Sequence, residues 1–280
     1  MSELTWNRYG KSRVRLVKVS RARDPHELID LTIDIQLEGA FDAVYADGDN
    51  ASCIATDTMK NTVYALARRQ PIDHVESFAI ALADHFATMP AVERVRVSAI
   101  EHPWQRLSAG GRPHPHAFVR PGGEHWTAVI CRDADGVDVR SGVADLVVLK
   151  TTDSAFCGFP RDAYTTLPDT DDRILATSVT ATWKYRRDAA DYAARQRIRD
   201  ALVDTFAAHQ SLSVQHTMYA MAESALDACD AVADITLTMP NRHHLLVDLT
   251  PFGLDNPNEI FVATDQPYGL IEATVTRTKD

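Results

Sequence analysis

Three histidines near the middle of the chain are the first side chains whose type and spacing could do chemistry. His114 and His116 alternate along a short segment, so on a strand they would share one face, and His125 follows soon after them. Imidazole nitrogens bind zinc and related metals, but such a site also needs further ligands at a compatible spacing. No carboxylate lies at such a spacing, and we therefore predict no metal.

Other motifs that would bring a cofactor or a nucleophile are missing from the sequence. The four cysteines, at positions 53, 131, 157 and 229, form no Cys-x-x-Cys pair, so neither a zinc cage nor a disulfide framework is predicted. The chain has no Gly-x-Gly-x-x-Gly, no Walker loop, no His-Glu-x-x-His and no Gly-x-Ser-x-Gly elbow. Nucleotide cofactors and serine hydrolase chemistry are therefore not expected.

The charge of the chain restricts its partners. A formal net charge of −10 argues against tight binding to nucleic acid, and an anionic ligand would need a local positive site. No apolar run is long enough to span a bilayer, and the N-terminal residues lack a signal-peptide core. The last four residues, Arg-Thr-Lys-Asp, differ from a peroxisomal Ser-Lys-Leu signal. We predict a bacterial cytoplasmic protein that binds neither membranes nor nucleic acids.

The first half of the chain alternates between strand and helix periodicity. Apolar residues at positions 31, 33, 35 and 37 alternate with polar ones, which is typical of a half-buried strand. Between residues 73 and 88, the apolar spacing is that of a helix with one buried face. Strands are predicted at 13–19, 28–38, 92–101, 116–119 and 126–131, and helices at 58–69 and 73–88.

The second half repeats this order. Strands are predicted at 145–151, 173–185, 233–239 and 243–249, and helices at 189–209 and 214–228. The hexapeptide Thr62–Ala67 also matches Thr217–Ala222 at an offset of 155 residues, which favours an internal repeat.

The repeated order predicts an α+β fold of two ββααββ units, each an antiparallel sheet with its helices on one face. We place the units at residues 8–140 and 141–277, with the boundary near Gly136–Val143, where Asp133–Gly136 is typical of a turn. Open sheet edges are usually paired or covered, so edge-to-edge oligomerisation is expected.

Six segments in a fixed order relate the chain to a known family. They are Tyr9-Gly10-Lys11, Ala55–Thr62, Pro113–Phe118, the block Leu149–Phe159 continued by Arg161–Leu167 and Asp172–Leu175, Val214-Gln215, and Pro240–His243. In identity, order and spacing they are similar to the motifs of urate oxidase (uricase), and the chain resembles that family.

The resemblance implies an architecture and a reaction. It implies the tunnelling fold, with two tandem ββααββ units per chain and four chains assembled as a homotetramer around a central channel, so that the sheets form a barrel. Urate and O2 would be the substrates, and neither metal nor organic cofactor would take part. Each active site would lie between two subunits, with Lys11, Thr56 and Asp57 from one chain and the remaining residues from its neighbour.

The resemblance also assigns roles to individual residues. It assigns substrate binding to Thr56, Asp57, Phe156, Arg173, Val214, Gln215 and Asn241, and catalysis to Lys11, Thr56 and His243. A guanidinium at 173 offers a rigid fork of donors to one edge of an anion, and an amide at 215 can donate and accept at another edge. An aromatic ring at 156 would stack on the purine.

The resemblance also implies a proton relay, and the weak basicity of a hydroxyl explains why the relay needs a second group. The threonine needs a neighbour that accepts its proton, and a lysine can serve. Lys11 would be the base, Thr56 the relay, and His243 the group that receives or returns a proton on the water side. Asn241, together with Thr56, would hold O2 first and the attacking water later.

Each site residue also has an ordinary structural interpretation. Lys11 would be a solvated lysine, Asp57 or Thr58 the N-cap of the following helix, Arg173 one half of a surface ion pair with its neighbouring aspartates, Phe156 a core residue, and Gln215 part of a first helical turn. His243 and His244 are adjacent on a predicted strand, so only one of them should face the site.

Some positions depart from the usual family pattern, and two other functions compete. His244, Arg242, Cys157 and Pro160 are atypical, and we expect Cys157, beside the presumed stacking ring, to be sensitive to peroxide. A pterin cyclohydrolase or aldolase of the same fold would usually anchor its ring with a glutamate and, for the cyclohydrolase, zinc. A non-catalytic urate-binding oligomer would not need the intact relay.

Overall fold

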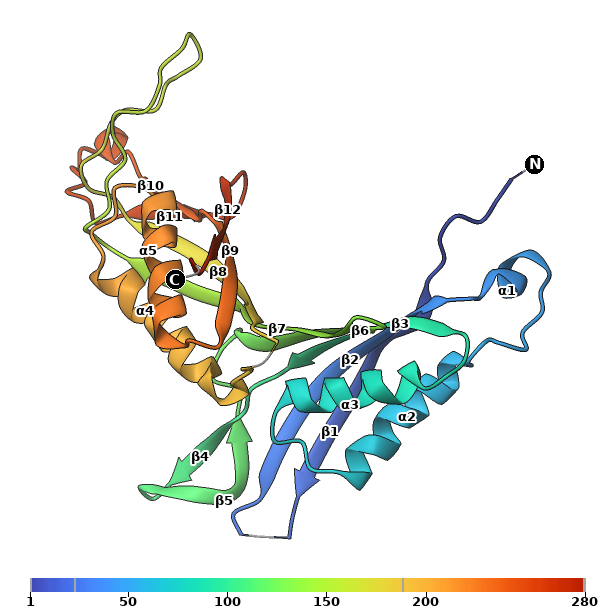
Figure 1. Ribbon diagram of the computed structural model, residues 1–280. Helices are drawn as coiled ribbons and strands as arrows, with labels where there is room; N and C mark the ends of the chain where they lie inside the picture. The colour runs from blue at the N-terminus through green and yellow to red at the C-terminus, as the bar shows by residue number, and fades with distance from the viewer. Residues whose placement is uncertain (1, 23, 188, 279–280) are drawn as a thin grey trace. The chain divides into compact units, whose positions relative to one another are not determined.

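The computed structural model describes residues 2–22, 24–187 and 189–278 and divides the chain into two compact units (Figure 1). The first unit extends to Gly142 and also includes Lys184–Ala193. The second comprises Val143–Trp183 and the chain from Ala194 onward. Within the described residues, no helix is both long and apolar enough to cross a membrane.

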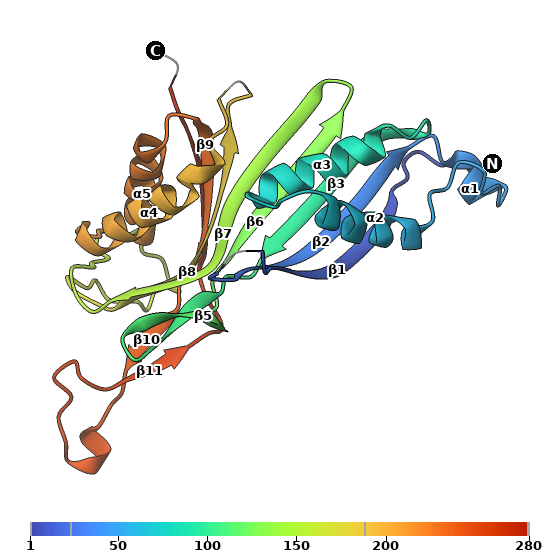
Figure 2. The same ribbon diagram turned by 90° about the horizontal axis from the view of Figure 1, so that it is seen from below.

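The first unit is an antiparallel sheet with two helices on one face (Figure 2). Its strand order is β1-β2-β3-β6-β7, and helices α2 and α3 cover the sheet. The strands are β1 (Tyr9–Ser20), β2 (Glu27–Gly39), β3 (Val92–Glu101), β6 (His125–Asp133) and the first part of β7 (Gly136–Lys150); the helices are α2 (Thr56–Arg69), α3 (Val75–Ala87) and the short α1 (Asp42–Ala46). Between β3 and β6, strands β4 (Gln105–Ala109) and β5 (Arg112–Val119) form a separate hairpin.

The core of this unit follows the predicted alternation. Leu31, Ile33, Ile35 and Leu37 of β2 are fully buried, and in the sheet register Ile35 faces Val97 of β3. The predicted apolar face of α3 is buried as well: Val75, Phe78, Ala79, Leu82 and Phe86. Burial of these side chains stabilises the sheet and its helices together.

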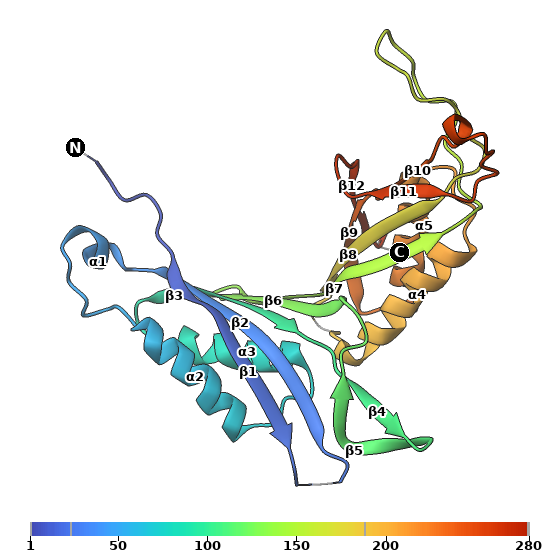
Figure 3. The ribbon, with the colours of Figure 1, turned by 180° about the vertical axis from the view of Figure 1, so that it is seen from behind.

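The second unit has the same order of elements (Figure 3). The last part of β7 is followed by β8 (Leu175–Tyr185), α4 (Arg195–Ala208), α5 (Val214–Ala228), β9 (Val232–Pro240) and β12 (Leu270–Thr276). The sheet order is β7-β8-β9-β12, and α5 packs on β9 and β12. Between β9 and β12, strands β10 (His243–Leu246) and β11 (Phe261–Thr264) form a separate two-stranded sheet. Short 3-10 turns occur at Tyr192–Ala194 and Thr250–Phe252.

The structure differs from the predicted elements at three places. The strand that closes the second sheet is β12, which pairs with β9, whereas the predicted closing segment 243–249 pairs with β11. The predicted turn at Asp133–Gly136 does connect two strands, but the residues after it continue one long strand, β7, through Gly136–Val143. Helix α4 also begins at Arg195, six residues after the predicted start.

The predicted repeat of the element order is confirmed, but the offset of 155 residues between the two repeats is wrong. Helix α4 begins at Arg195, 139 residues after α2 begins at Thr56, and α5 begins at Val214, 139 residues after α3 begins at Val75. The matching hexapeptides lie instead in α2 and α5, which are the first helix of one unit and the second of the other. Their similarity at 155 residues therefore arises from two helices that occupy different places in their units.

Candidate active site

Arg173 lies just before β8 and has the properties of an anion-binding residue. It is partly buried, burial lowers the pKa of its guanidinium, and its Nε has no hydrogen-bond partner within the described residues. The alternative prediction, a surface ion pair between Arg173 and a neighbouring aspartate, is not found within the described residues. The Asp172 carboxylate instead accepts a hydrogen bond from the Thr152 hydroxyl (2.8 Å). A desolvated guanidinium with a donor to spare can take an anionic ligand.

Phe156 lies beside this guanidinium rather than in the core. The Arg173 Cζ is 5.2 Å from the centre of the Phe156 ring, and the ring is only partly buried. Backbone hydrogen bonds in both directions join Phe156 to Thr170, at 2.8 Å and 3.1 Å. The segment that leads into Arg173 therefore holds Phe156 in place.

The start of helix α5 is joined to the same segment. The Ala155 N–H donates to the Ser211 carbonyl (2.8 Å), and the Ser211 N–H donates to the Asp153 carbonyl (2.9 Å). Ser213 caps the helix, because its hydroxyl accepts from the His216 N–H at 3.1 Å. Val214 is then buried, and Gln215, in the first helical turn, is exposed.

Asn241 and His243 lie along the first residues of β8. The Arg242 N–H donates to the Ala176 carbonyl (2.9 Å), and Asn241 forms a bridge with Thr177. His243 begins β10, opposite Thr264, and is partly exposed. The second unit thus connects Phe156, Arg173, Val214, Gln215, Asn241 and His243 through hydrogen-bonded neighbouring segments.

The remaining predicted residues belong to the first unit, where Lys11 lies on β1. It pairs with Ile35 of β2, and the register shifts between Lys11 and Val14, where Arg13 adopts a φ of 57°. The residue before it must be glycine, because a Cβ at Gly10 would lie 1.8 Å from the Ile35 carbonyl oxygen. The close pairing and the bulge together fix the backbone on both sides of Lys11.

Thr56 and Asp57 form the first turn of α2, so the predicted N-cap at Asp57 or Thr58 is wrong. The N-cap is Ala55, which makes no side-chain cap. The Asp57 carboxylate instead accepts from the Lys60 ammonium and from the Asn61 amide (2.9 Å). Lys60 contributes most to lowering the pKa of Asp57, and Lys11 contributes further, so Lys11 and Asp57 interact electrostatically.

Cys157 follows Phe156 and is exposed, and its predicted sensitivity to peroxide stays a prediction. The sulfur donates to the Thr170 carbonyl at 3.1 Å, and Asp171 lies 3.5 Å away. Local desolvation of the sulfur and the Asp171 carboxylate raise the pKa of the Cys157 thiol. Because the thiolate is the form that attacks peroxide, a raised pKa disfavours oxidation at neutral pH, whereas the exposure of Cys157 favours it.

The three histidines do not converge on one another. The His114 and His116 rings are 4.6 Å apart, whereas His125 lies beside His102 at 6.3 Å. Within the part of the chain that the structure describes, no group of three or more His, Cys, Asp or Glu residues is arranged to hold a metal.

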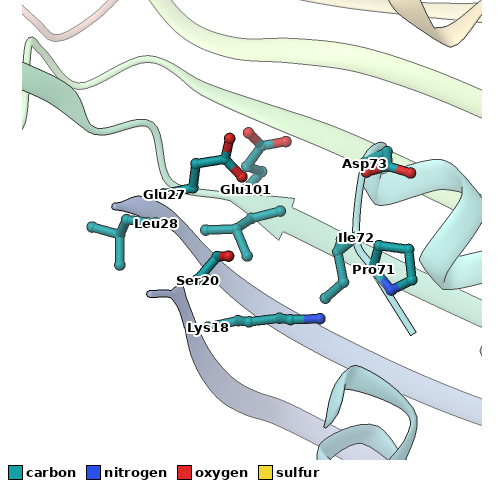
Figure 4. A pocket seen from close by; sticks show the side chains of 9 residues that line it. Lys18, Ser20, Glu27, Leu28, Pro71, Ile72, Asp73 and Glu101 are labelled. Atoms are coloured by element: carbon teal, nitrogen blue, oxygen red, sulfur yellow. The ribbon is translucent and has the colours of Figure 1, made fainter. Parts of the chain in front are cut away.

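One cavity of the first unit, of about 280 Å³, lies apart from the predicted site residues (Figure 4). The side chains of Glu27, Glu101 and Asp73 line it together with Ile72 and Lys18. The Lys18 ammonium donates to the Gln70 carbonyl at 2.6 Å. None of the predicted site residues lines this cavity.

Sequence reasoning missed the residues that hold the site together. Asp172 and Phe159 lie within the segments that resemble the family but were assigned no role there, and Ser211 lies outside those segments. Ser154 and Ser211 form a buried parallel bridge between two segments that are more than fifty residues apart in the sequence. Such pairings depend on tertiary structure. The only sequence signal for them is the cluster of small polar residues before Phe156 and before Val214.

Known proteins resemble this chain over nearly its whole length. A family model described as "Uricase" matches residues 7–131 and 139–272. The uricase of Arthrobacter globiformis is 46% identical over 273 residues, which cover 97% of this chain and 89% of that protein. The uricase of Dictyostelium discoideum is 37% identical, with 99% of both chains covered.

The fold comparison gives the same result. The crystal structure of uricase from Arthrobacter globiformis aligns with a TM-score of 0.95 at 45% identity, and the alignment covers 100% of this chain and 96% of that one. The chain belongs to the uricase family, and its α+β architecture of two ββααββ units is the tunnelling fold.

Proposed function

We propose that the protein oxidises urate with O2 and water to 5-hydroxyisourate and hydrogen peroxide. Membership of the uricase family supports the reaction. The observation that carries it within the molecule is the partly buried Arg173 guanidinium, which lies over the Phe156 ring and has a free donor. An aromatic face beside an unpaired guanidinium suits a flat anion such as urate.

Substrate recognition would use the second unit. Arg173 would donate to two acceptors on one edge of urate, and Gln215 would both donate and accept at another edge. Phe156 would stack on the ring, while Val214 and Asn241 would complete the contacts. The hydrogen bonds among segments 153–156, 170–173 and 211–215 support this proposal, because they hold the three recognition residues at fixed positions.

The proton relay would use Lys11, Thr56 and His243. Lys11 would accept the proton of the Thr56 hydroxyl, and the Thr56 oxygen would in turn remove a proton from urate. His243 would return a proton on the side where water attacks. Asn241 and Thr56 would hold O2 first and the attacking water later, and Asp57 would help to orient the substrate. The packing of α2 against β1, which carry Thr56 and Lys11, supports this pairing.

The chemistry would require no organic cofactor and no metal. Triplet O2 reacts poorly with closed-shell molecules, but an electron-rich urate dianion can give up one electron at a time. Urate loses two electrons overall, O2 gains them with two protons to form hydrogen peroxide, and water supplies the hydroxyl of the product. The protein would orient the reactants and move the protons.

The assembly would be a homotetramer whose active sites are shared between subunits. One subunit would supply Lys11, Thr56 and Asp57, and its neighbour would supply the residues of the second unit. The exposed edges of β1 and β12, which each pair with a single strand, support assembly through the sheets. We place the enzyme in the cytoplasm, where its four unpaired cysteines would stay reduced.

The reaction is tested by following urate absorbance and oxygen uptake with metal-stripped protein and no added cofactor. We expect matched losses of urate and O2 and an equal yield of peroxide. Absence of any urate loss would refute the proposal and direct attention to pterin substrates. Lys11→Met should lower turnover with urate binding largely kept, and unchanged turnover would refute the relay.

Shared sites can be tested by co-expressing two inactive variants, Lys11→Met and Arg173→Ala. If sites are shared, some sites in mixed oligomers combine the intact Lys11 of one subunit with the intact Arg173 of another, and activity returns. If each site lies within one chain, every site lacks one of the two residues and the mixture stays inactive.

A further inference from the structure

Phe159 lies against the proposed stacking residue and has no role in the reaction described above. Its ring centre is 4.8 Å from that of Phe156, and the two ring planes differ by only 11°. This is an offset-stacked pair, a favourable arrangement for two aromatic rings. The parallel ring of Phe159 therefore covers one face of Phe156.

Each ring of this pair also meets a guanidinium group. Arg173 Cζ lies 5.2 Å from the Phe156 centre, and Arg161 Cζ lies 4.9 Å from the Phe159 centre. Phe156 thus meets both the Phe159 ring and the Arg173 guanidinium, and Phe159 meets both the Phe156 ring and the Arg161 guanidinium.

The Arg161 side chain beside Phe159 is held by its own contacts. Arg161 pairs with the Asp169 carboxylate at 3.1 Å and donates to the Leu167 carbonyl at 3.2 Å. Asp169 also accepts from the Gly158 N–H at 3.1 Å. Gly158 has a φ of 73°, a left-handed conformation that folds the chain back so that Phe159 can meet Phe156.

We infer that Phe159 is a positioning residue: it packs against one face of Phe156 and holds that ring beside the Arg173 guanidinium, where the purine would bind. This inference rests on the proposed oxidation of urate. Without Phe159, the Phe156 ring could rotate or tilt away from Arg173, and the stacking face and the guanidinium fork would lose their fixed spacing. Urate would then bind less tightly, while the proton relay would be untouched.

The test compares Phe159→Leu, which removes the aromatic face, with Phe159→Tyr, which keeps it. We expect Phe159→Leu to raise the KM for urate about two- to tenfold, the value of one aromatic stack, with kcat within about twofold. Phe159→Tyr should restore the wild-type KM. Phe118→Leu is a matched control, because Phe118 also lies beneath a guanidinium, that of Arg106 at 4.8 Å, but belongs to the first unit.

An unchanged KM in Phe159→Leu would overturn the inference. So would a fall in kcat and melting temperature with the KM unchanged, because that pattern indicates loss of folded protein only. The wild-type protein is assayed beside the variants: if it fails to oxidise urate, the proposed function fails. In that case, calorimetry with xanthine still tests the inference, because it compares the purine affinity of the wild type with that of Phe159→Leu. Equal affinities would refute the role of Phe159 in supporting a purine-binding face.

Discussion

The two units begin their second helix in the same way and use that helix end differently. Helix α3 starts with Val75 and Glu76, and α5 starts with Val214 and Gln215. Both valines are buried against their sheets, but Glu76 is 1% exposed and accepts from the buried Ser141 hydroxyl, whereas Gln215 is exposed. One helix end is closed by the protein, and the other is open to a ligand.

The charge of the two side chains explains the difference. The first turn of a helix carries unpaired N–H groups and a partial positive charge, which favour an anion. In the first unit, the acidic Glu76 lies in the first turn of α3; the first turn of α5 has no acidic residue. If Gln215 binds the substrate as proposed, its neutral amide would leave this positive end available to anionic urate.

Exchanging the two side chains gives the largest expected effect. Gln215→Glu would place a carboxylate against the urate anion, and the repulsion should raise the KM on the order of a hundredfold. Glu76→Gln should leave the KM unchanged. Steady-state kinetics of both variants measure this, with the melting temperature as a check on folding. A similar rise in KM for both would mean that the two helix ends do not differ as described.

Removing the buried carboxylate should affect stability instead of binding. Glu76→Ala leaves the Ser141 hydroxyl without this acceptor in a buried place, and we expect a loss of about 2 kcal/mol in the free energy of unfolding. Urea titration of the variant gives this value, and Gln215→Ala is the matched control, with little expected change. The comparison fails if Gln215→Ala is as destabilising as Glu76→Ala.

The N-cap residues of the two helices also differ, and we expect a smaller effect on stability from them. Ser213 caps α5 through its hydroxyl, while His74 at the corresponding place on α3 makes no side-chain cap. Ser213→Ala should cost about 1 kcal/mol of stability and raise the urate KM modestly, because Gln215 is two residues away. His74→Ala should cost no capping energy. Equal kinetics for Ser213→Ala and wild type would show that the cap does not position Gln215.

The smallest expected effect is a dependence of stability on pH. Burial lowers the pKa of His209 in the second unit, with further lowering from His216 and Lys150. The folded pKa is then below the ordinary 6.5, so the unfolded chain binds more protons in this window. The contribution of neutral His209 to the free energy of unfolding is therefore fully present above about pH 6.5. It is lost as the pH falls through the folded pKa.

Replacing His209 tests this sign directly. His209→Gln should flatten the decline in unfolding free energy between about pH 7 and 5, by less than about 1 kcal/mol. Urea titrations at a series of pH values measure the slope. His102 in the first unit also has a lowered pKa, caused mainly by burial, so His102→Gln is the corresponding variant there. A steeper slope in His209→Gln would contradict the assigned direction.

Local patterns were sufficient to predict most elements of the fold. The alternation in β2 and the helical spacing in α3 are direct consequences of one buried face, and both were confirmed. The choice of β12 over segment 243–249 as the closing strand was missed, because both segments are short and apolar, and only pairing across the sheet distinguishes them. The true repeat offset of 139 was hidden because equivalent helices share a burial pattern and little sequence.

The site residues were named from the resemblance, and their roles stay predictions. Composition alone could not have separated Arg173 from an ordinary surface arginine; its free Nε and its place over Phe156 come from tertiary structure. The support from Asp172, Ser211 and Phe159 depends on contacts between segments, and sequence spacing does not reveal such contacts.

Strand β7 has a practical consequence for dividing or permuting the protein. Its first residues belong to one unit and its last residues to the other, and Lys184–Ala193, which begins within the end of β8, belongs again to the first unit. A cut at the middle of the chain would therefore leave both fragments with an incomplete sheet. The exposed turn at Gly110 and Gly111, between β4 and β5, interrupts only a separate hairpin. New termini or an inserted reporter domain should be tolerated there far better than between the two repeats.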